Sequence, residues 1–193
     1  MVPTHPIDTK GRPIILIGLM GCGKTTVGKA LSMRTGMPLL DTDAVIEEQY
    51  KKSIPRIFEE DGEGTFRTLE TTLLRYLQES RGKQPPAIIS TGGGIVVRPE
   101  NRAILHELGF VVWLNVSVSA LMARTAHASN RPLLEVEDRR ATLMNLSNLR
   151  RPMYAETAHL RLDTTRMDVK NVVREICNHA DRFFHKLPHG EQD

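Results

Sequence analysis

A glycine-rich segment near the start of the chain has the residue types that phosphate binding requires. Residues 18–25 read GLMGCGKT and fit the pattern G-x-x-x-x-G-K-[ST]. Glycines let the backbone turn tightly and point successive N–H groups at phosphate oxygens, and the following helix adds its positive N-terminal end. We expect Lys24 to reach the β- and γ-phosphates and Thr25 to ligate Mg²⁺. The residues expected to contact the nucleotide here are Gly21, Cys22, Gly23, Lys24, Thr25 and Thr26.

This segment predicts nucleotide binding but not a particular reaction, because motors, GTPases and small-molecule kinases all use such a loop. Cys22 occupies one of its variable positions. A thiol near a positive helix end can become reactive, but we interpret Cys22 as a passive small residue.

Two carboxylates, Asp41 and Asp43, follow a short apolar run over residues 38–40. Ligands of parallel sheets bind beyond the carboxyl ends of the strands. One of the two aspartates could therefore hold Mg²⁺ through water while the other accepts a hydrogen bond from a substrate hydroxyl. Alternatively, Asp43 caps a helix over residues 44–50 and Asp41 is a solvated loop residue. The residues alone leave both interpretations open.

Two further kinds of feature are weak when each is taken alone. Gly92, Gly93 and Gly94 follow a third apolar run, where they form either a tight turn or a close backbone approach to a ligand. Isolated arginines such as Arg67, which follows an acidic stretch, are usually surface ion pairs of little energetic value.

Short apolar runs alternate with helical periodicity along the chain, which predicts a three-layer α/β/α fold with a parallel sheet covered on both faces. Five strands are expected, at residues 13–17, 38–40, 87–91, 110–115 and 159–163. Helices are expected at residues 25–35, 44–50, 66–78, 99–108, 117–126, 138–154 and 169–184, with a further helix capped by Ser53. The helix over 138–154 is expected to break near Pro152.

Composition narrows the class of protein. The chain has 193 residues, 40% of them hydrophobic and 25% charged, which is typical of a single globular domain. The formal charge of +3 is too small to indicate nucleic-acid binding. No apolar run approaches the ~18 residues that span a membrane, and the N-terminus lacks the apolar core of a signal peptide. Two cysteines without CxxC spacing fit a reduced, cytoplasmic protein. Since no heptads are visible, we expect a monomer.

Taken together and in order, six segments resemble the shikimate kinase family: GLMGCGKTT, DTD, GEGTFR, TGGG, RPLL and RRPMY. The resemblance runs from about residue 14 to residue 184, and TGGG and RPLL are more specific than the phosphate loop. It implies a P-loop kinase fold with a small substrate-binding region and a mobile lid. It also implies an enzyme that uses ATP and Mg²⁺ to phosphorylate the 3-hydroxyl of shikimate, in the pathway to chorismate and the aromatic amino acids.

The resemblance also assigns roles to single residues. It makes Lys24, Asp43 and Arg131 catalytic, with Arg131 on a lid that closes over phosphate. Thr25 would ligate Mg²⁺ directly and Asp41 through water. The shikimate carboxylate would be clamped by Arg67 and Arg150, and Arg124 would pack on adenine. The remaining substrate-binding residues would be Asp43, Gly92, Gly93 and Gly94.

Two of these assignments stay open. Asp43 acts either as a general base or as an orienting group, because both roles fit a loose transition state. Arg151 follows Arg150 directly, and we prefer Arg150 as the carboxylate ligand because it lies two residues before the proline.

The expected organisation is one domain over residues 13–185, between flexible tails at residues 1–12 and 186–193. Within the domain we expect a substrate-binding region at about 41–75 and a lid at about 124–138. Three other functions are the alternatives: a gluconate-type kinase of the same fold, a ligand-binding protein without catalysis, and a regulatory or nucleic-acid P-loop ATPase. TGGG and RPLL count against the first, and the presence of Lys24, Asp43 and Arg131 counts against the second. The modest charge counts against the third.

Overall fold

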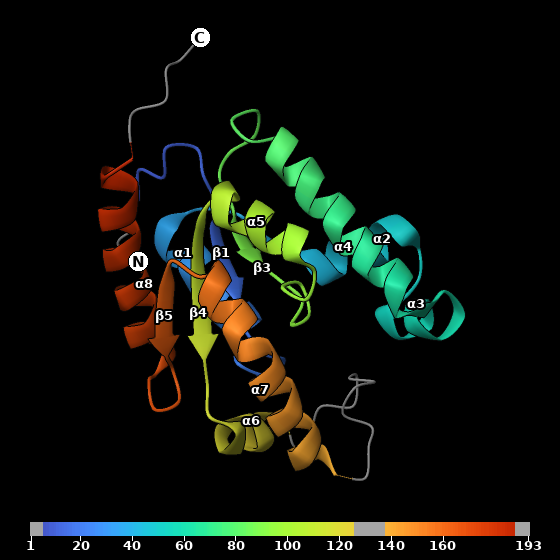
Figure 1. The fold of residues 1–193 in the computed structure, drawn as a ribbon. Helices are drawn as coiled ribbons and strands as arrows, with labels where there is room; N and C mark the ends of the chain where they lie inside the picture. Colours follow the sequence, from blue (N-terminus) through green and yellow to red (C-terminus); the bar gives the residue numbers. More distant parts are fainter. Residues whose placement is uncertain (1–5, 126–137, 188–193) are drawn as a thin grey trace.

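A five-stranded parallel sheet forms the centre of the computed structural model, which describes residues 6–125 and 138–187 (Figure 1). The strands lie in the order β2-β3-β1-β4-β5, and every pair of neighbours is parallel. Their bounds are β1 Ile14–Ile17, β2 Leu39–Asp41, β3 Ile88–Ser90, β4 Phe110–Asn115 and β5 Leu160–Asp163. The predicted sheet of five parallel strands is confirmed.

Helices cover both faces of the sheet. Helices α1 (Lys24–Thr35) and α8 (Val169–His185) pack together on one face, whereas α5 (Pro99–Leu108) lies between α4 (Gly62–Glu79) and α7 (Arg139–Thr157) on the other (Figure 1). The short helices α2 (Thr42–Tyr50) and α3 (Ile54–Glu60) lie beside α4, and α6 (Val118–Thr125) lies beside α7. The three layers are those expected from alternating strands and helices.

Apolar strands form the core because both faces of the sheet are covered. All four residues of β1 are fully buried, and β4 is buried over five of its six residues. Burial on both sides is what near-continuous Ile, Leu and Val runs allow in a parallel sheet. A smaller cluster of Ile46, Ile57, Phe66 and Leu73 joins α2, α3 and α4 into a separate packed corner. This corner holds one wall of the site described below.

Two local predictions were wrong, and each has a physical reason. Asp43 does not cap the second helix: Asp41 is its N-cap, accepting from the backbone N–H of Asp43 at 3.1 Å and of Ala44 at 3.5 Å. This places Asp43 in the first turn of α2. Nor does Pro152 end α7, which continues to Thr157. Tertiary packing of the last turn, where Tyr154 and Thr157 are buried, outweighs the hydrogen bond that proline cannot donate.

The segment before β1 packs on the domain where the structure describes it. Ile7 belongs to the main hydrophobic cluster and Thr9 is buried. Part of the segment expected to be a flexible tail therefore contributes to the core. Among the described helices, none is both long and apolar enough to cross a membrane.

The carboxyl ends of β1, β2 and β3 converge on one edge of the sheet. β1 continues into residues 18–23, β2 ends at Asp41, and β3 runs into Thr91 and the three glycines. Backbone pairing aligns Asp41 with Ser90 across β2 and β3. Loops that follow parallel strands at this edge are where such folds bind ligands.

Candidate active site

A cavity of about 1030 Å³ opens at the carboxyl edge of the sheet, between the phosphate loop and the α2–α4 corner. It brings together residues that the sequence had singled out from six separate segments. Those lining it are Gly21, Cys22, Gly23, Lys24, Thr25, Thr26, Asp41, Asp43, Arg67, Gly92, Gly93, Gly94, Arg124 and Arg150. Arg131 lies outside the described residues, so its position is not part of this geometry.

The phosphate loop has the backbone that the glycine pattern predicts. Gly18 has a φ of +144°, and a methyl group on its Cα would lie 2.7 Å from the Leu114 carbonyl oxygen. Gly23 is the N-cap of α1, with a φ of +101°. A left-handed residue at the start of the helix turns the loop back on itself, which leaves the first N–H groups of α1 facing the cavity. Anions are stabilised at such a helix end.

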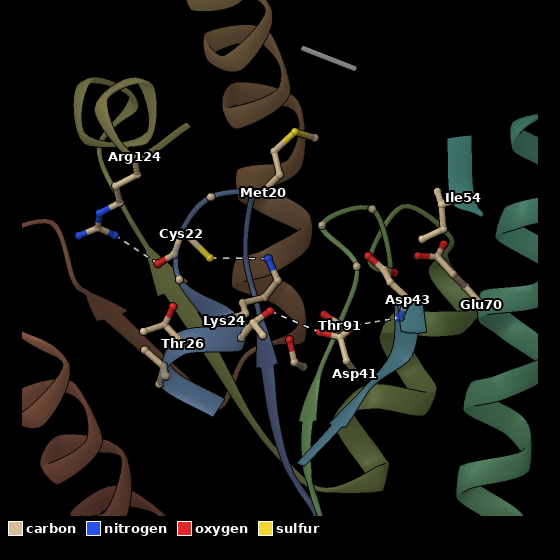
Figure 2. Close-up of a pocket in the computed structure, with 18 of the residues that line it drawn as sticks. Met20, Cys22, Lys24, Thr26, Asp41, Asp43, Ile54, Glu70, Thr91 and Arg124 are labelled. Atoms are coloured by element: carbon tan, nitrogen blue, oxygen red, sulfur yellow. Dashed lines mark hydrogen bonds between the residues drawn. The ribbon is translucent and has the colours of Figure 1, made fainter. Parts of the chain in front are cut away.

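Lys24 folds back over the loop. Its Nζ donates to the carbonyl oxygens of Gly18 at 2.7 Å and Leu19 at 3.0 Å, and lies 3.7 Å from Cys22 Sγ. The side chain is only 8% exposed, yet it lines the cavity (Figure 2). Because the carbonyls that hold this buried ammonium are neutral, its positive charge favours an anionic ligand in the cavity.

Thr25 and Asp41 approach each other across the mouth of the loop. Thr25 Oγ1 donates to Asp41 Oδ2 at 3.3 Å, while Asp41 Oδ1 caps α2. A hydroxyl and a carboxylate oxygen are ligand types that Mg²⁺ accepts, with the remaining positions taken by water and phosphate. The pair therefore fits the magnesium site that the sequence predicts.

Asp43 and Glu70 place two carboxylates at the far end of the cavity (Figure 2). A methyl group on Gly92 would lie 2.6 Å from Asp43 Oδ1 and 3.1 Å from Glu70 Oε1, and neither buried oxygen has a hydrogen-bond partner among the described residues. Burial raises the pKa of Asp43 to about 6, and the neighbouring Asp41 adds to this, against the opposing charge of Lys24. Burial raises the pKa of Glu70 to about 7, although the Arg67 charge opposes it. Unpaired buried acceptors are costly, so this end of the cavity favours a ligand that donates hydrogen bonds.

Arg67 is held by an acidic residue on each side. Its guanidinium contacts Glu63 Oε1 at 2.7 Å and Glu70 Oε2 at 2.8 Å, all three residues being on α4. A side chain on Gly94 would overlap this guanidinium, so the glycine is required by space and not by its backbone angles. Arg67 itself is 6% exposed. The ion pairs fix the orientation of the guanidinium beside the cavity.

Arg150 reaches the same end of the cavity from α7. Its Nη1 donates to the Gly93 carbonyl oxygen at 3.2 Å, and its buried Nε has no hydrogen-bond partner in the part of the chain that the structure describes. The side chain is 5% exposed. Arg67 and Arg150 thus line one cavity from different helices, an arrangement suited to a planar anion such as a carboxylate.

Arg124 lines the cavity on the side of the phosphate loop. Its guanidinium donates to the carbonyl oxygens of Cys22 at 3.3 Å and Thr164 at 3.2 Å (Figure 2). It therefore joins α6 to the phosphate loop and to the segment after β5. That segment also brings Thr164 and Met167 to the cavity wall.

Sequence reasoning missed several residues of this cavity. Glu70 is fully buried, and the available signal was its position three residues after Arg67 on one helix. Phe58 and Phe66, whose ring centroids lie 5.1 Å apart, line the cavity together with Ile54. All three are apolar residues of short helical segments, and helical periodicity alone does not separate wall residues from core residues.

Comparisons with known proteins agree with this geometry. A family model described as shikimate kinase matches residues 20–181. Shikimate kinases from Thioalkalivibrio sulfidiphilus (strain HL-EbGR7) and Dechloromonas aromatica (strain RCB) are each 43% identical to the chain. The first match covers 89% of this chain and 88% of the relative, and the second covers 89% and 92%. A solved structure of shikimate kinase from Acinetobacter baumannii in complex with shikimate superposes with a TM-score of 0.82. It is 37% identical, and the match covers 91% of this chain and 95% of that one. The match of the family model over most of the chain, with these relatives, shows that the protein belongs to the shikimate kinase family of ATP-dependent kinases.

Proposed function

We propose that this chain carries out the reaction of its family, transfer of the γ-phosphoryl group of ATP to the 3-hydroxyl of shikimate. The products are shikimate 3-phosphate and ADP, on the route to the aromatic amino acids. The observation that carries the proposal is the pairing of two sites in one cavity: a phosphate loop at one end, and two arginines with two carboxylates at the other. An acceptor with one carboxylate and several hydroxyls matches that second end group by group.

The acceptor carboxylate binds between Arg67 and Arg150. The unpartnered Nε of Arg150 supports this role, because a buried guanidinium N–H without an acceptor favours an incoming anion. The ion pairs with Glu63 and Glu70 hold Arg67 in place before the ligand arrives. A preorganised clamp reduces the entropy lost on binding and sets the direction of the ring.

The acceptor hydroxyls face Asp43. Its unpartnered Oδ1 accepts their hydrogen bonds, and its carboxylate takes the proton of the attacking hydroxyl. A pKa raised to about 6 keeps the group mostly ionised at neutral pH while making it a better proton acceptor than an ordinary aspartate. The oxygen forms its bond to the γ-phosphorus as the bond to the bridging oxygen of ADP breaks.

The phosphates of ATP lie on the loop over residues 18–25, where Lys24 leaves the loop carbonyls to meet the β- and γ-phosphates. Thr25 and Asp41 would hold Mg²⁺, the latter through water. Bound there, the ion neutralises phosphate charge that builds up during transfer. Arg124 contacts the adenine side of the nucleotide, and the backbone of Gly21, Cys22, Gly23 and Thr26 completes the phosphate contacts.

The remaining parts of the proposal concern organisation. Residues 13–185, together with the packed segment that contains Ile7, form one domain, with a substrate-binding region at about 41–75. The lid expected at about 124–138 falls almost entirely outside the described residues. Arg131, which is outside the described residues, would bring positive charge to the transferring phosphate and help exclude water. The enzyme acts as a monomer in the cytoplasm and requires neither nucleic acid nor membrane.

The proposal is tested by following ADP release from ATP and Mg²⁺ with shikimate, quinate or gluconate as the acceptor. Release that depends on shikimate and exceeds that with quinate or gluconate at least tenfold is expected. Equal or greater release with gluconate would assign the chain to a different acceptor.

A further inference from the structure

Tyr154 is a buried side chain that does not line the cavity itself but donates a hydrogen bond to Gly93, which does. It lies on α7, is 1% exposed, and its hydroxyl donates to the Gly93 carbonyl oxygen at 2.5 Å. Its ring stacks on Trp113 of β4, with centroids 5.7 Å apart and an angle of 27° between the planes. The ring is therefore fixed from behind, and the hydroxyl has one defined acceptor.

That acceptor lies between the two halves of the site. A methyl group on Gly93 would lie 3.1 Å from the Met20 backbone nitrogen and 3.5 Å from the Gly18 carbonyl oxygen, so Gly93 packs directly on the phosphate loop. The Gly18 carbonyl in turn accepts from Lys24 Nζ at 2.7 Å. A shift of Gly93 would consequently move the loop that holds the phosphates.

On its other side, the same carbonyl is tied to the acceptor end. Arg150, one helical turn before Tyr154, donates to it at 3.2 Å. A carbonyl oxygen has two lone pairs, so both donors are accommodated. When Arg150 turns its hydrogen bonds toward an acceptor carboxylate, Tyr154 is the donor that remains on Gly93.

The surroundings of the phenol suit a structural donor. Burial raises the pKa of Tyr154 well above its usual range, which keeps the hydroxyl neutral and able to donate. The ring shares a small enclosed space with Leu19 and Cys22 of the phosphate loop. Both the hydroxyl and the ring therefore contact elements that the reaction must align.

We propose that Tyr154 is a positioning residue that sets the spacing between the phosphate loop and the acceptor pocket through the Gly93 carbonyl. The proposal rests on the function proposed above, phosphoryl transfer from a nucleotide on the loop to an acceptor between the arginines. Transfer requires the donor phosphorus and the acceptor oxygen to be in line. A change in their relative position of well below ~1 Å therefore lowers the rate of transfer more than it weakens binding.

The test is Tyr154→Phe, which keeps the ring and its stacking on Trp113 and removes only the hydroxyl. We expect kcat to fall about tenfold or more. KM for ATP and for shikimate should each change less than about twofold, and the share of ATP hydrolysed without phosphorylating shikimate should rise. Tyr76→Phe is the matched control, because Tyr76 is 53% exposed on α4. Its kinetics are expected to equal those of the unchanged enzyme.

An unchanged kcat in Tyr154→Phe, with only a lower melting temperature, would make the residue purely structural and overturn the proposal. A rise in KM for shikimate at constant kcat would also overturn it, because that result belongs to a binding residue. Failure of the unchanged enzyme to phosphorylate shikimate would instead contradict the proposed function.

A second measurement keeps the proposal testable if Tyr154→Phe does not fold. The chain contains three tyrosines, so fluorotyrosine labelling of the unchanged sequence gives three ¹⁹F resonances. Tyr50→Phe and Tyr76→Phe assign the third by elimination. The Tyr154 resonance is expected to shift when shikimate alone binds, and again when a non-hydrolysable ATP analogue alone binds. A resonance that responds to neither ligand would overturn the proposal.

Discussion

Two carboxyl groups that line the cavity lower the stability of the folded chain. Asp43 and Glu70 are two carboxyl groups beside Gly92, each with an unpartnered oxygen and a raised pKa. Functional sites commonly hold groups in such environments at the expense of stability. We therefore expect that removing one of these charges stabilises the ligand-free protein while it destroys activity.

The first prediction concerns Asp43→Asn and pH. The pKa of Asp43 is about 6 in the folded chain, above its ordinary value of 3.8, so the folded state binds more protons than the unfolded state between these values. Stability from this group is therefore present at low pH and is lost as pH rises toward 6. Asparagine has no proton to lose, so this loss of stability is absent from Asp43→Asn. The substitution should therefore raise the free energy of unfolding, relative to the unchanged chain, more at pH 8 than at pH 4.5. Since Asp43 is only partly buried, we expect on the order of 1–2 kcal/mol and not the ~3 kcal/mol of a full two-unit shift.

Denaturant unfolding at the two pH values measures this effect. Glu48→Gln serves as the control, because Glu48 is exposed on the same helix. A stability difference between the two pH values that is the same for Asp43→Asn and the unchanged chain would contradict the raised pKa. Retention of more than about a tenth of the activity would contradict the proton-accepting role.

The second prediction concerns Arg67→Lys. Lysine keeps the positive charge beside Glu70 but cannot form the two parallel hydrogen bonds that guanidinium offers to a carboxylate. Loss of one charge-assisted hydrogen bond of about 1.5–3 kcal/mol corresponds to a rise of roughly tenfold to a hundredfold in KM for shikimate. KM for ATP should not change.

Steady-state kinetics with each substrate varied in turn would check this outcome. Arg75→Lys is the control, since Arg75 lies on the same helix with its side chain 61% exposed. A higher KM for ATP with an unchanged KM for shikimate would move Arg67 to the nucleotide side.

At the scale of elements, the cap of α2 serves both the helix and the site. Asp41 accepts from the first backbone N–H groups of α2 with one oxygen and contacts Thr25 with the other. Asp168 caps α8 in a similar way, accepting from the Asn171 N–H at 2.7 Å, but does not line the cavity. The two caps therefore form a matched pair in which only one is expected to affect the reaction.

The third prediction compares Asp41→Ala with Asp168→Ala. Loss of an N-cap costs about 1 kcal/mol, so each variant should melt roughly 2–4 °C below the unchanged chain. Asp41→Ala should in addition require a higher Mg²⁺ concentration for half-maximal activity, whereas Asp168→Ala should not. Thermal unfolding and a magnesium titration of the rate measure the two effects. An identical magnesium dependence in both variants would remove Asp41 from the metal site.

The elements show what the sequence could predict. Buried strands bounded by glycine and helices of clear period are local signals, so α5 and β4 have the predicted bounds. The identity of the N-cap of α2 and the continuation of α7 past Pro152 depend on tertiary contacts that one-dimensional patterns do not contain. For the same reason, the phosphate loop was identifiable from its spacing, whereas Glu70 was not. Glu70 becomes part of the site only because the folded chain packs α4 against the segment that contains Gly92, Gly93 and Gly94.

At the scale of the whole molecule, the sheet decides which segments can act together. β1, β2 and β3 are neighbours and parallel, so residues 18–25, 41–43 and 91–94 emerge at one edge although they are far apart in sequence. Helices α4 and α7 add one arginine each from different regions of the chain. The separation of the nucleotide and acceptor ends within one cavity is thus a consequence of topology.

In the proposed reaction, one cavity positions ATP and shikimate for direct transfer to a single hydroxyl. The most direct test is to identify the product by ³¹P and ¹H NMR after incubation with ATP, Mg²⁺ and shikimate, beside the same incubation with Asp43→Asn. We expect the unchanged chain to place phosphate on the 3-hydroxyl alone, with one ADP formed for each shikimate phosphorylated, and Asp43→Asn to form little product. Phosphate on another hydroxyl, or ADP formed with free phosphate in place of shikimate 3-phosphate, would contradict the proposed reaction.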